Sequence, residues 1–248
     1  MSTTMSARPG QPARLTKPGG LIDRYFYFFM SLLIAVTVVY GFSHTVGNNL
    51  FHPAVPRPTV LSFHAAVFSG WVIFFFFQSA LIRTHNVRLH RLTGWLGAAL
   101  GAAIPLVGIP TAITMTRFHL HQLHESDGAA FILVPFFDVT CFTIAFWLAL
   151  YWRKKPEFHR RLVLIATCAL TAAAFGRFPA SILPPIAFYA GVDALILLGV
   201  VRDFIVNRRV HKVYACALPA LMVCQFAVMH TVVTNAAWWL KIANAIVG

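Results

Sequence analysis

The chain has 248 residues, of which 58% are hydrophobic and only 11% are charged, and its mean hydropathy is +0.72. Soluble domains carry about 25% charged residues, so this balance indicates a membrane protein and argues against a separate soluble domain. The formal net charge of +13 would also suit a nucleic-acid-binding protein. The basic residues, however, are spread over short segments between apolar runs, so we expect no nucleic-acid partner.

The first segment of the chain differs from the rest. Residues 1–20 are polar and rich in proline and glycine, and the apolar run that follows has no small-x-small cleavage site. This composition is typical of a disordered segment and not of a signal peptide. We expect residues 1–20 to form a disordered cytoplasmic tail and residues 21–248 to form one transmembrane domain.

The remainder of the chain consists of apolar runs separated by short polar segments. A helix that crosses a bilayer needs roughly 20 mostly apolar residues, and seven runs reach or approach that length. The sequence therefore predicts an all-α fold, a polytopic bundle of seven transmembrane helices. The predicted helices cover residues 22–43, 60–82, 92–116, 130–152, 161–177, 184–202 and 213–236.

The lysines and arginines predict the orientation of this bundle. Sixteen of them lie in the tail and in the loops near residues 83–91, 153–161 and 202–212, and four lie on the opposite side. Cytoplasmic loops carry the excess of basic residues, so the N-terminus is expected inside and the C-terminus outside.

The three inner loops share a local pattern. Each ends in a histidine followed by a basic residue, and this pair opens the next helix. The pairs are His90 and Arg91, His159 and Arg160, and His211 and Lys212. The pattern is compatible with three hairpins built on one plan, and equally with basic helix starts that the charge asymmetry alone would produce.

Two further patterns concern packing. Gly97 and Gly101 form a GxxxG pair, which lets two helices approach closely, and we favour packing within the chain over a dimer contact. Trp238 and Trp239 follow the last predicted helix, where aromatic side chains are typical of the membrane interface.

Ionisable groups are costly inside a bilayer, so those in the predicted helices are candidate functional residues. Asp138 and Asp193 lie in two helices that start outside, and Arg177 ends a third helix on that side. His64 and His230 lie near the outer ends of two more helices. Counting about 1.5 Å per residue places all five near one level in the outer half of the bundle, where Arg177 is expected to pair with Asp138 or Asp193.

A polar stripe accompanies this set. His64, Trp71 and Gln78 recur every seven residues, so they share one face of their helix, and we expect that face to look inward. Together with the two aspartates and the arginine, Trp71 and Gln78 complete the predicted buried polar network.

Three interpretations of these residues remain open. The first is a packing network without chemistry. The second, our preferred functional hypothesis, assigns His64 and His230 as axial ligands of a haem b or a metal, in a redox-linked or cofactor-handling protein that is not an enzyme. The third is a proton- or ion-coupled transporter that uses the carboxylates. A structural or assembly subunit, with the bilayer and other membrane subunits as partners, is a further alternative.

Two motifs carry a family resemblance. The stretch FHAAVFSGWVIFFFFQSALIRTHNVRLHRLTGWLG fits H-x6-W-x6-Q followed by LHR-x2-G, and FHRRL precedes a helix that ends in R-x-P. Over roughly residues 60–240 the chain resembles a group of uncharacterised bacterial multi-pass membrane proteins. The resemblance implies a bacterial inner membrane and no defined activity. Some distantly similar proteins are linked to respiratory-oxidase assembly, which adds weight to the cofactor hypothesis.

The charge asymmetry generates a topology prediction. Alkaline phosphatase, which folds only outside the cytoplasm, should be active when fused after Gly248 and inactive when fused in the loop near residue 88. A green fluorescent protein fusion should give the reverse pattern. A C-terminal reporter that is active only in the cytoplasm would contradict the predicted orientation.

Overall fold

A computed structural model describes residues 20–124 and 128–248, so residues 1–19 of the expected tail at residues 1–20 lie outside the described part. All regular secondary structure in the described ranges is helical. The helices are α1 (Leu21–Ser43), α2 (Val60–Arg83), α3 (Val87–Gln122), α4 (Gly128–Phe131), α5 (Leu133–Tyr151), α6 (Pro156–Ala169), α7 (Ala172–Phe175), α8 (Phe188–Asn207), α9 (Lys212–Val233) and α10 (Ala237–Val247), with a π turn at Gly47–Phe51 and a 3-10 turn at Pro185–Ala187.

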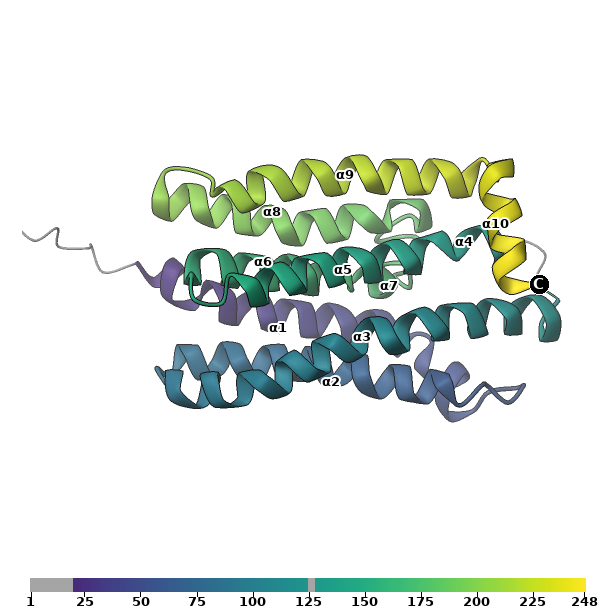
Figure 1. The fold of residues 1–248 in the computed structure, drawn as a ribbon, viewed down its shortest axis with the longest axis horizontal. Coiled ribbons are helices and arrows are strands. Elements are labelled where there is room, and N and C mark those ends of the chain that lie inside the picture. The colour runs from purple at the N-terminus through teal and green to yellow at the C-terminus, as the bar shows by residue number, and fades with distance from the viewer. Residues whose placement is uncertain (1–19, 125–127) are drawn as a thin grey trace, which may run out of the picture.

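The long helices run side by side in one bundle, and α10 lies across one end of it (Figure 1). We call that end the α10 end and the other, where α1 begins, the Leu21 end. Six segments are long and apolar enough to cross a membrane, so the chain is a multi-pass membrane protein. They are Leu21–Ser43, Val60–Arg83, Val87–Gln122, Gly128–Tyr151, Pro156–Phe175 and Lys212–Val233.

The remaining long helix, α8, is not among these six segments. It has 20 residues and runs beside the others (Figure 1), but it carries Asp193, Arg202 and Asp203. The all-α membrane class is confirmed, whereas the structure supports six apolar spans where the sequence predicts seven.

Two predicted helices have different limits in the structure. α3 begins at Val87, where the Asn86 side chain accepts a hydrogen bond from the Leu89 amide at 3.2 Å, and it continues to Gln122. Its 36 residues are about 54 Å long, which exceeds the hydrocarbon core of about 30 Å. The helix predicted at 161–177 begins at Pro156, because proline suits the first turn of a helix, and it divides into α6 and α7.

The C-terminal helix was not predicted. α10 has 11 residues, or about 16 Å, which is too short to cross a bilayer. Trp239 is buried and its Nε1 donates to the Ala130 carbonyl at 2.9 Å, whereas Trp238 is exposed. Arg117 donates to the Ile246 carbonyl at 2.7 Å, near the end of α10 where helix carbonyls lack partners. One tryptophan therefore fixes α10 to the bundle, and the other faces outward, as in a helix that lies in the membrane interface.

Small residues allow close contacts between the helices. A Cβ atom on Gly97 would collide with Phe74 of α2, and one on Gly101 would collide with Phe146 of α5. The GxxxG pair thus packs against two helices of the same chain. A Cβ on Gly41 of α1 would collide with backbone atoms of Ala174 in α7. Backbone atoms inside a packed helix cannot move aside as the end of a side chain can.

The glycine contacts predict opposite effects of one substitution at two sites. Gly41→Ala should lower the free energy of unfolding by about 1–3 kcal/mol, because the new methyl group overpacks the α1–α7 contact. Gly94→Ala, where nothing lies within 4 Å of the new atom, should be neutral or raise stability by up to about 1 kcal/mol. The measurement is the melting temperature of each variant in the same detergent, and we expect that of Gly41→Ala to be the lower. Equal melting temperatures would contradict the close contact between α1 and α7.

Candidate functional site

Arg161 of α6 and Asp203 of α8 form a buried ion pair at the Leu21 end. Both residues are 0% exposed. The guanidinium donates from Nε to Oδ2 at 2.8 Å and from Nη2 to Oδ1 at 2.5 Å. Asp203 also accepts hydrogen bonds from Arg202 Nη1 at 2.7 Å and from the His211 amide at 3.2 Å. A single carboxylate therefore joins α6, α8 and the start of α9.

The ion pair belongs to a larger network. Arg202 pairs with Asp23 of α1, and Arg161 donates to Glu157 Oε2 at 2.6 Å. Arg160 donates to both oxygens of Glu157. Three arginines thus face three carboxylates, so the charges balance. This balance and the complete pairing of Asp203 indicate that the network holds helices together.

Sequence reasoning placed the arginines of this network in loops and missed its acidic members. The signal was present in the charged pair Arg202 and Asp203, which ends an apolar run and lies on a helix that continues to Asn207. Because the predicted helix ends at residue 202, Asp203 was not among the predicted buried polar residues.

The expected helix-start residues all lie at this end. His159 Nδ1 is 2.9 Å from the Ala149 carbonyl, and Lys212 lies over the Phe158 ring. His211 caps α9, and its Nδ1 accepts from the Val213 amide at 3.2 Å. Burial and the nearby Arg161 guanidinium lower the pKa of His211. The remaining three are Arg160 in the network, Arg91 on the surface, and His90, whose Nδ1 is buried without a partner.

A second polar group lies deeper in the bundle, between α5, α8 and α9. Asp138 is 8% exposed and accepts a hydrogen bond from the Tyr189 hydroxyl at 3.0 Å. Asp193 follows Tyr189 by one turn of α8 and interacts with the buried Gln225 of α9. One carboxylate oxygen of Asp193, Oδ1, is buried without a hydrogen-bond partner. Within residues 20–124 and 128–248, neither aspartate has a basic partner. We call these four residues the carboxylate group.

The expected pairing of Arg177 with Asp138 or Asp193 is wrong. Arg177 donates from Nε to Thr45 Oγ1 at 3.2 Å and from Nη1 to the Ala173 carbonyl, and its guanidinium lies 4.4 Å from the Phe42 ring centre. The segment before it, α7, packs on α1 and α8, whereas Asp138 bonds to Tyr189 of α8 and Asp193 interacts with Gln225 of α9. Residue counting gave a similar depth for these groups, but depth does not determine the side of the bundle.

The expected haem site between His64 and His230 is not formed. His64 lies on α2, which packs on α1 and α3, and His230 lies on α9, which packs on α8, α5 and α6. Figure 1 shows α2 and α9 at opposite edges of the bundle. His64 stacks on Phe68 with ring centres 3.9 Å apart, and His230 is exposed. Axial ligands must contact one iron, so this pair cannot bind a single haem.

Trp71 and Gln78 join neighbouring helices and lie apart from the carboxylate group. Both are buried, at 4% and 8% exposed. Trp71 Nε1 donates to Thr167 of α6 at 3.3 Å, and Gln78 Nε2 donates to Thr93 of α3 at 2.7 Å. These bonds satisfy polar groups that lipid could not. The stripe therefore faces inward and contributes to packing.

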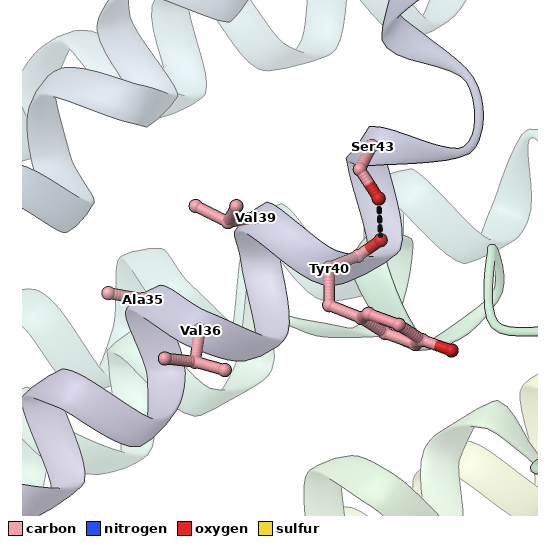
Figure 2. Close-up of a pocket in the computed structure, with 5 residues that line it drawn as sticks. All are labelled: Ala35, Val36, Val39, Tyr40 and Ser43. Atoms are coloured by element: carbon pink, nitrogen blue, oxygen red, sulfur yellow. Dashed lines mark hydrogen bonds between the residues drawn. The ribbon is translucent and has the colours of Figure 1, made fainter.

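Two surface grooves along α1 are apolar. One lies on α1 and is lined by Ala35, Val36, Val39, Tyr40 and Ser43, and Figure 2 shows the Ser43 hydroxyl turned back to the Tyr40 carbonyl, to which it donates. A neighbouring groove along α1 includes Leu198 of α8. Neither groove has a charged side chain in its wall. Among the described residues, no three His, Cys, Asp or Glu side chains are arranged to hold a metal ion.

Comparisons with known proteins give no further guide. No family model matches the chain, and neither the curated proteins nor the solved structures include a significant match.

The ion-pair network predicts a large loss of stability. Asp203→Asn leaves the buried Arg161 and Arg202 without their shared carboxylate and should destabilise the protein by about 3–5 kcal/mol. Glu157→Gln, at the exposed edge of the same network, should cost less than about 1 kcal/mol. Thermal unfolding of the purified variants in detergent measures both effects, and equal losses would contradict the assignment of Asp203 as the central residue.

Proposed function

We propose that the chain moves protons or a small cation across the membrane, using Asp138 and Asp193 as the binding groups. The observation that carries this proposal is the contrast between the two sets of carboxylates. Asp23, Glu157 and Asp203 are each paired with arginine, whereas the interior Asp138 and Asp193 are not. An ionisable group inside a membrane is expensive, and one kept there without a basic partner is typical of a proton or ion pathway.

The geometry of the carboxylate group suits proton transfer. The Tyr189 hydroxyl donates to Asp138, and Asp193 lies one turn away on the same helix. A hydroxyl both donates and accepts. If Asp193 is protonated and Asp138 is ionised, Tyr189 can pass its proton to Asp138 as it receives one from Asp193. The net step moves one proton between the aspartates and leaves Tyr189 unchanged.

The same residues also suit a hard cation. Two carboxylates, the Tyr189 hydroxyl and the Gln225 amide oxygen are all oxygen donors, which such cations prefer. Gln225 reaches Asp193 from α9, so cation binding would draw α8 and α9 together. Proton and cation transfer therefore share this site, and flux measurements with proton- and sodium-sensitive dyes distinguish them. The separation of His64 from His230 removes the observation that favoured a redox cofactor.

The proposal includes α8 as a seventh span. Two of its three charged residues, Arg202 and Asp203, are paired within the network, so they do not oppose insertion of α8 as free charges would. Seven spans place the two chain termini on opposite sides. The basic loops then lie on the cytoplasmic side of an inner membrane, with the Leu21 end inside and α10 outside. The bilayer and possible further membrane subunits are its partners in this proposal.

The experiment is ion flux into proteoliposomes. Liposomes that contain a pH-sensitive or sodium-sensitive dye should show flux with the wild-type protein under an imposed membrane potential. Asp138→Asn and Asp193→Asn should reduce that flux at least tenfold, because an amide cannot carry the proton or the charge, and Tyr189→Phe should reduce it if protons are carried. Thr140→Val is the matched control on α5, since Thr140 is exposed and bonds to its own helix.

Each variant must first unfold at a temperature within a few degrees of the wild type, so that lost flux is not lost folding. Wild-type protein that passes neither protons nor sodium would overturn the proposal. So would unchanged flux in both aspartate variants.

A further inference from the structure

We propose that the α10 end binds an anion of the phosphate class, held by Arg57 and Arg177 together with His64. This site is separate from the carboxylate group and does not depend on the function proposed above. It involves three segments at this end of the bundle: the chain after α1, the start of α2, and the chain after α7, where Arg177 bonds to Thr45.

Arg177 is held in place by uncharged partners. Its Nε donates to Thr45 Oγ1 at 3.2 Å, its Nη1 donates to the Ala173 carbonyl, and the guanidinium stacks on Phe42. These contacts orient the side chain without neutralising it. His64 lies close enough to Arg177 to interact with its charge, and His64 Nδ1 is buried without a hydrogen-bond partner.

Arg57 is held in a similar way. Its Nη2 donates to Asn49 Oδ1 at 3.1 Å, and its guanidinium lies 4.9 Å from the Phe118 ring centre. Two more of its nitrogens, Nε and Nη1, are buried and have no partner. A buried donor without an acceptor costs free energy, and a guanidinium with two such donors is an unusual arrangement for a structural residue.

The two arginines are anchored on one helical turn. Thr45 and Asn49, their respective partners, are four residues apart, and the Asn49 amide donates to the Thr45 carbonyl at 3.0 Å. Side chains at this spacing lie on the same face, with Cβ atoms about 5–6 Å apart. Both guanidiniums therefore reach the same short segment, and the unpaired Nδ1 of His64 lies near the charge of Arg177.

Nothing acidic in the described part of the chain balances these charges. Three of its five carboxylates lie in the network at the Leu21 end, and the other two form the carboxylate group. Arg117 differs from both arginines, because it donates to the end of α10. The site therefore combines two fixed positive charges with free buried donors, and a bound anion would supply both the counter-charge and the acceptors.

The donor set points to phosphate. Guanidinium groups present parallel N–H donors that match phosphate oxygens, and two of them can hold one group from different sides. The residues lie at the end of the membrane-spanning helices, at the level where lipid headgroups are found. The phosphate could belong to a lipid headgroup or to a free phosphate compound, and the chemistry of recognition is the same.

The test is ligand-dependent stability of the full-length protein in detergent. Inorganic phosphate, phosphatidylglycerol and chloride at matched ionic strength are added separately, and the apparent affinity is taken from the shift in melting temperature. A shift with phosphate identifies a soluble anion, and a shift with phosphatidylglycerol alone identifies a headgroup. Arg57→Gln and Arg177→Gln should each weaken the binding at least tenfold, and His64→Gln should weaken it less. Arg117→Gln is the matched control at the same end and should bind as the wild type does.

Either shift supports the proposal only if it is lost in the Arg57 and Arg177 variants. The proposal is overturned if neither probe stabilises the wild type more than chloride does. It is also overturned if Arg117→Gln loses as much affinity as the other two. Should Arg177→Gln fail to fold, Arg57→Gln decides the result, because Arg57 lies in the segment before α2 and outside the spans.

Discussion

Four helices of this bundle depend on one carboxylate. Asp203 accepts hydrogen bonds from Arg161 of α6, from Arg202 of its own helix and from the first turn of α9, and Arg202 carries the connection to Asp23 of α1. Apolar surfaces give helices little reason to associate in lipid, because lipid tails are as apolar as leucine. Polar contacts that the bilayer cannot replace therefore determine which helices are neighbours, and those of Asp203 reach four of them.

The contacts of Asp203 also orient the carboxylate group. Tyr189 and Asp203 lie on α8 and are 14 residues apart, which is about four turns, so they face nearly the same side of the helix. Fixing Asp203 against α6 therefore turns Tyr189 toward Asp138 of α5. A residue at one end of α8 thus sets the orientation of a group about 21 Å away. The structural network and the carboxylate group share one rigid element, although their side chains do not touch.

The arginines at the two ends of the bundle have different kinds of partner. At the Leu21 end, three arginines and three carboxylates of the chain form ion pairs with one another, so their charges cancel. At the α10 end, Arg57 and Arg177 are held by amide, hydroxyl and aromatic groups, which orient a guanidinium but leave its charge in place. A cluster that neutralises itself needs no ligand, whereas one that is oriented and unneutralised is prepared for an anion. This contrast separates the residues that build the fold from those available for binding.

The sequence by itself determined that this is a helical membrane protein, and it placed most of the helices. Those results follow from hydrophobic length and from a fixed rise per residue, both of which are local. The tertiary structure decided which residues at one depth are neighbours: Asp138 meets Tyr189, Arg177 meets Thr45, and α2 is remote from α9. Depth depends on the position along a single helix, but the neighbours of a side chain depend on the rotation and order of all the helices. Those are set by contacts such as Arg161 with Asp203, between residues 42 positions apart, which no local pattern in the sequence reveals.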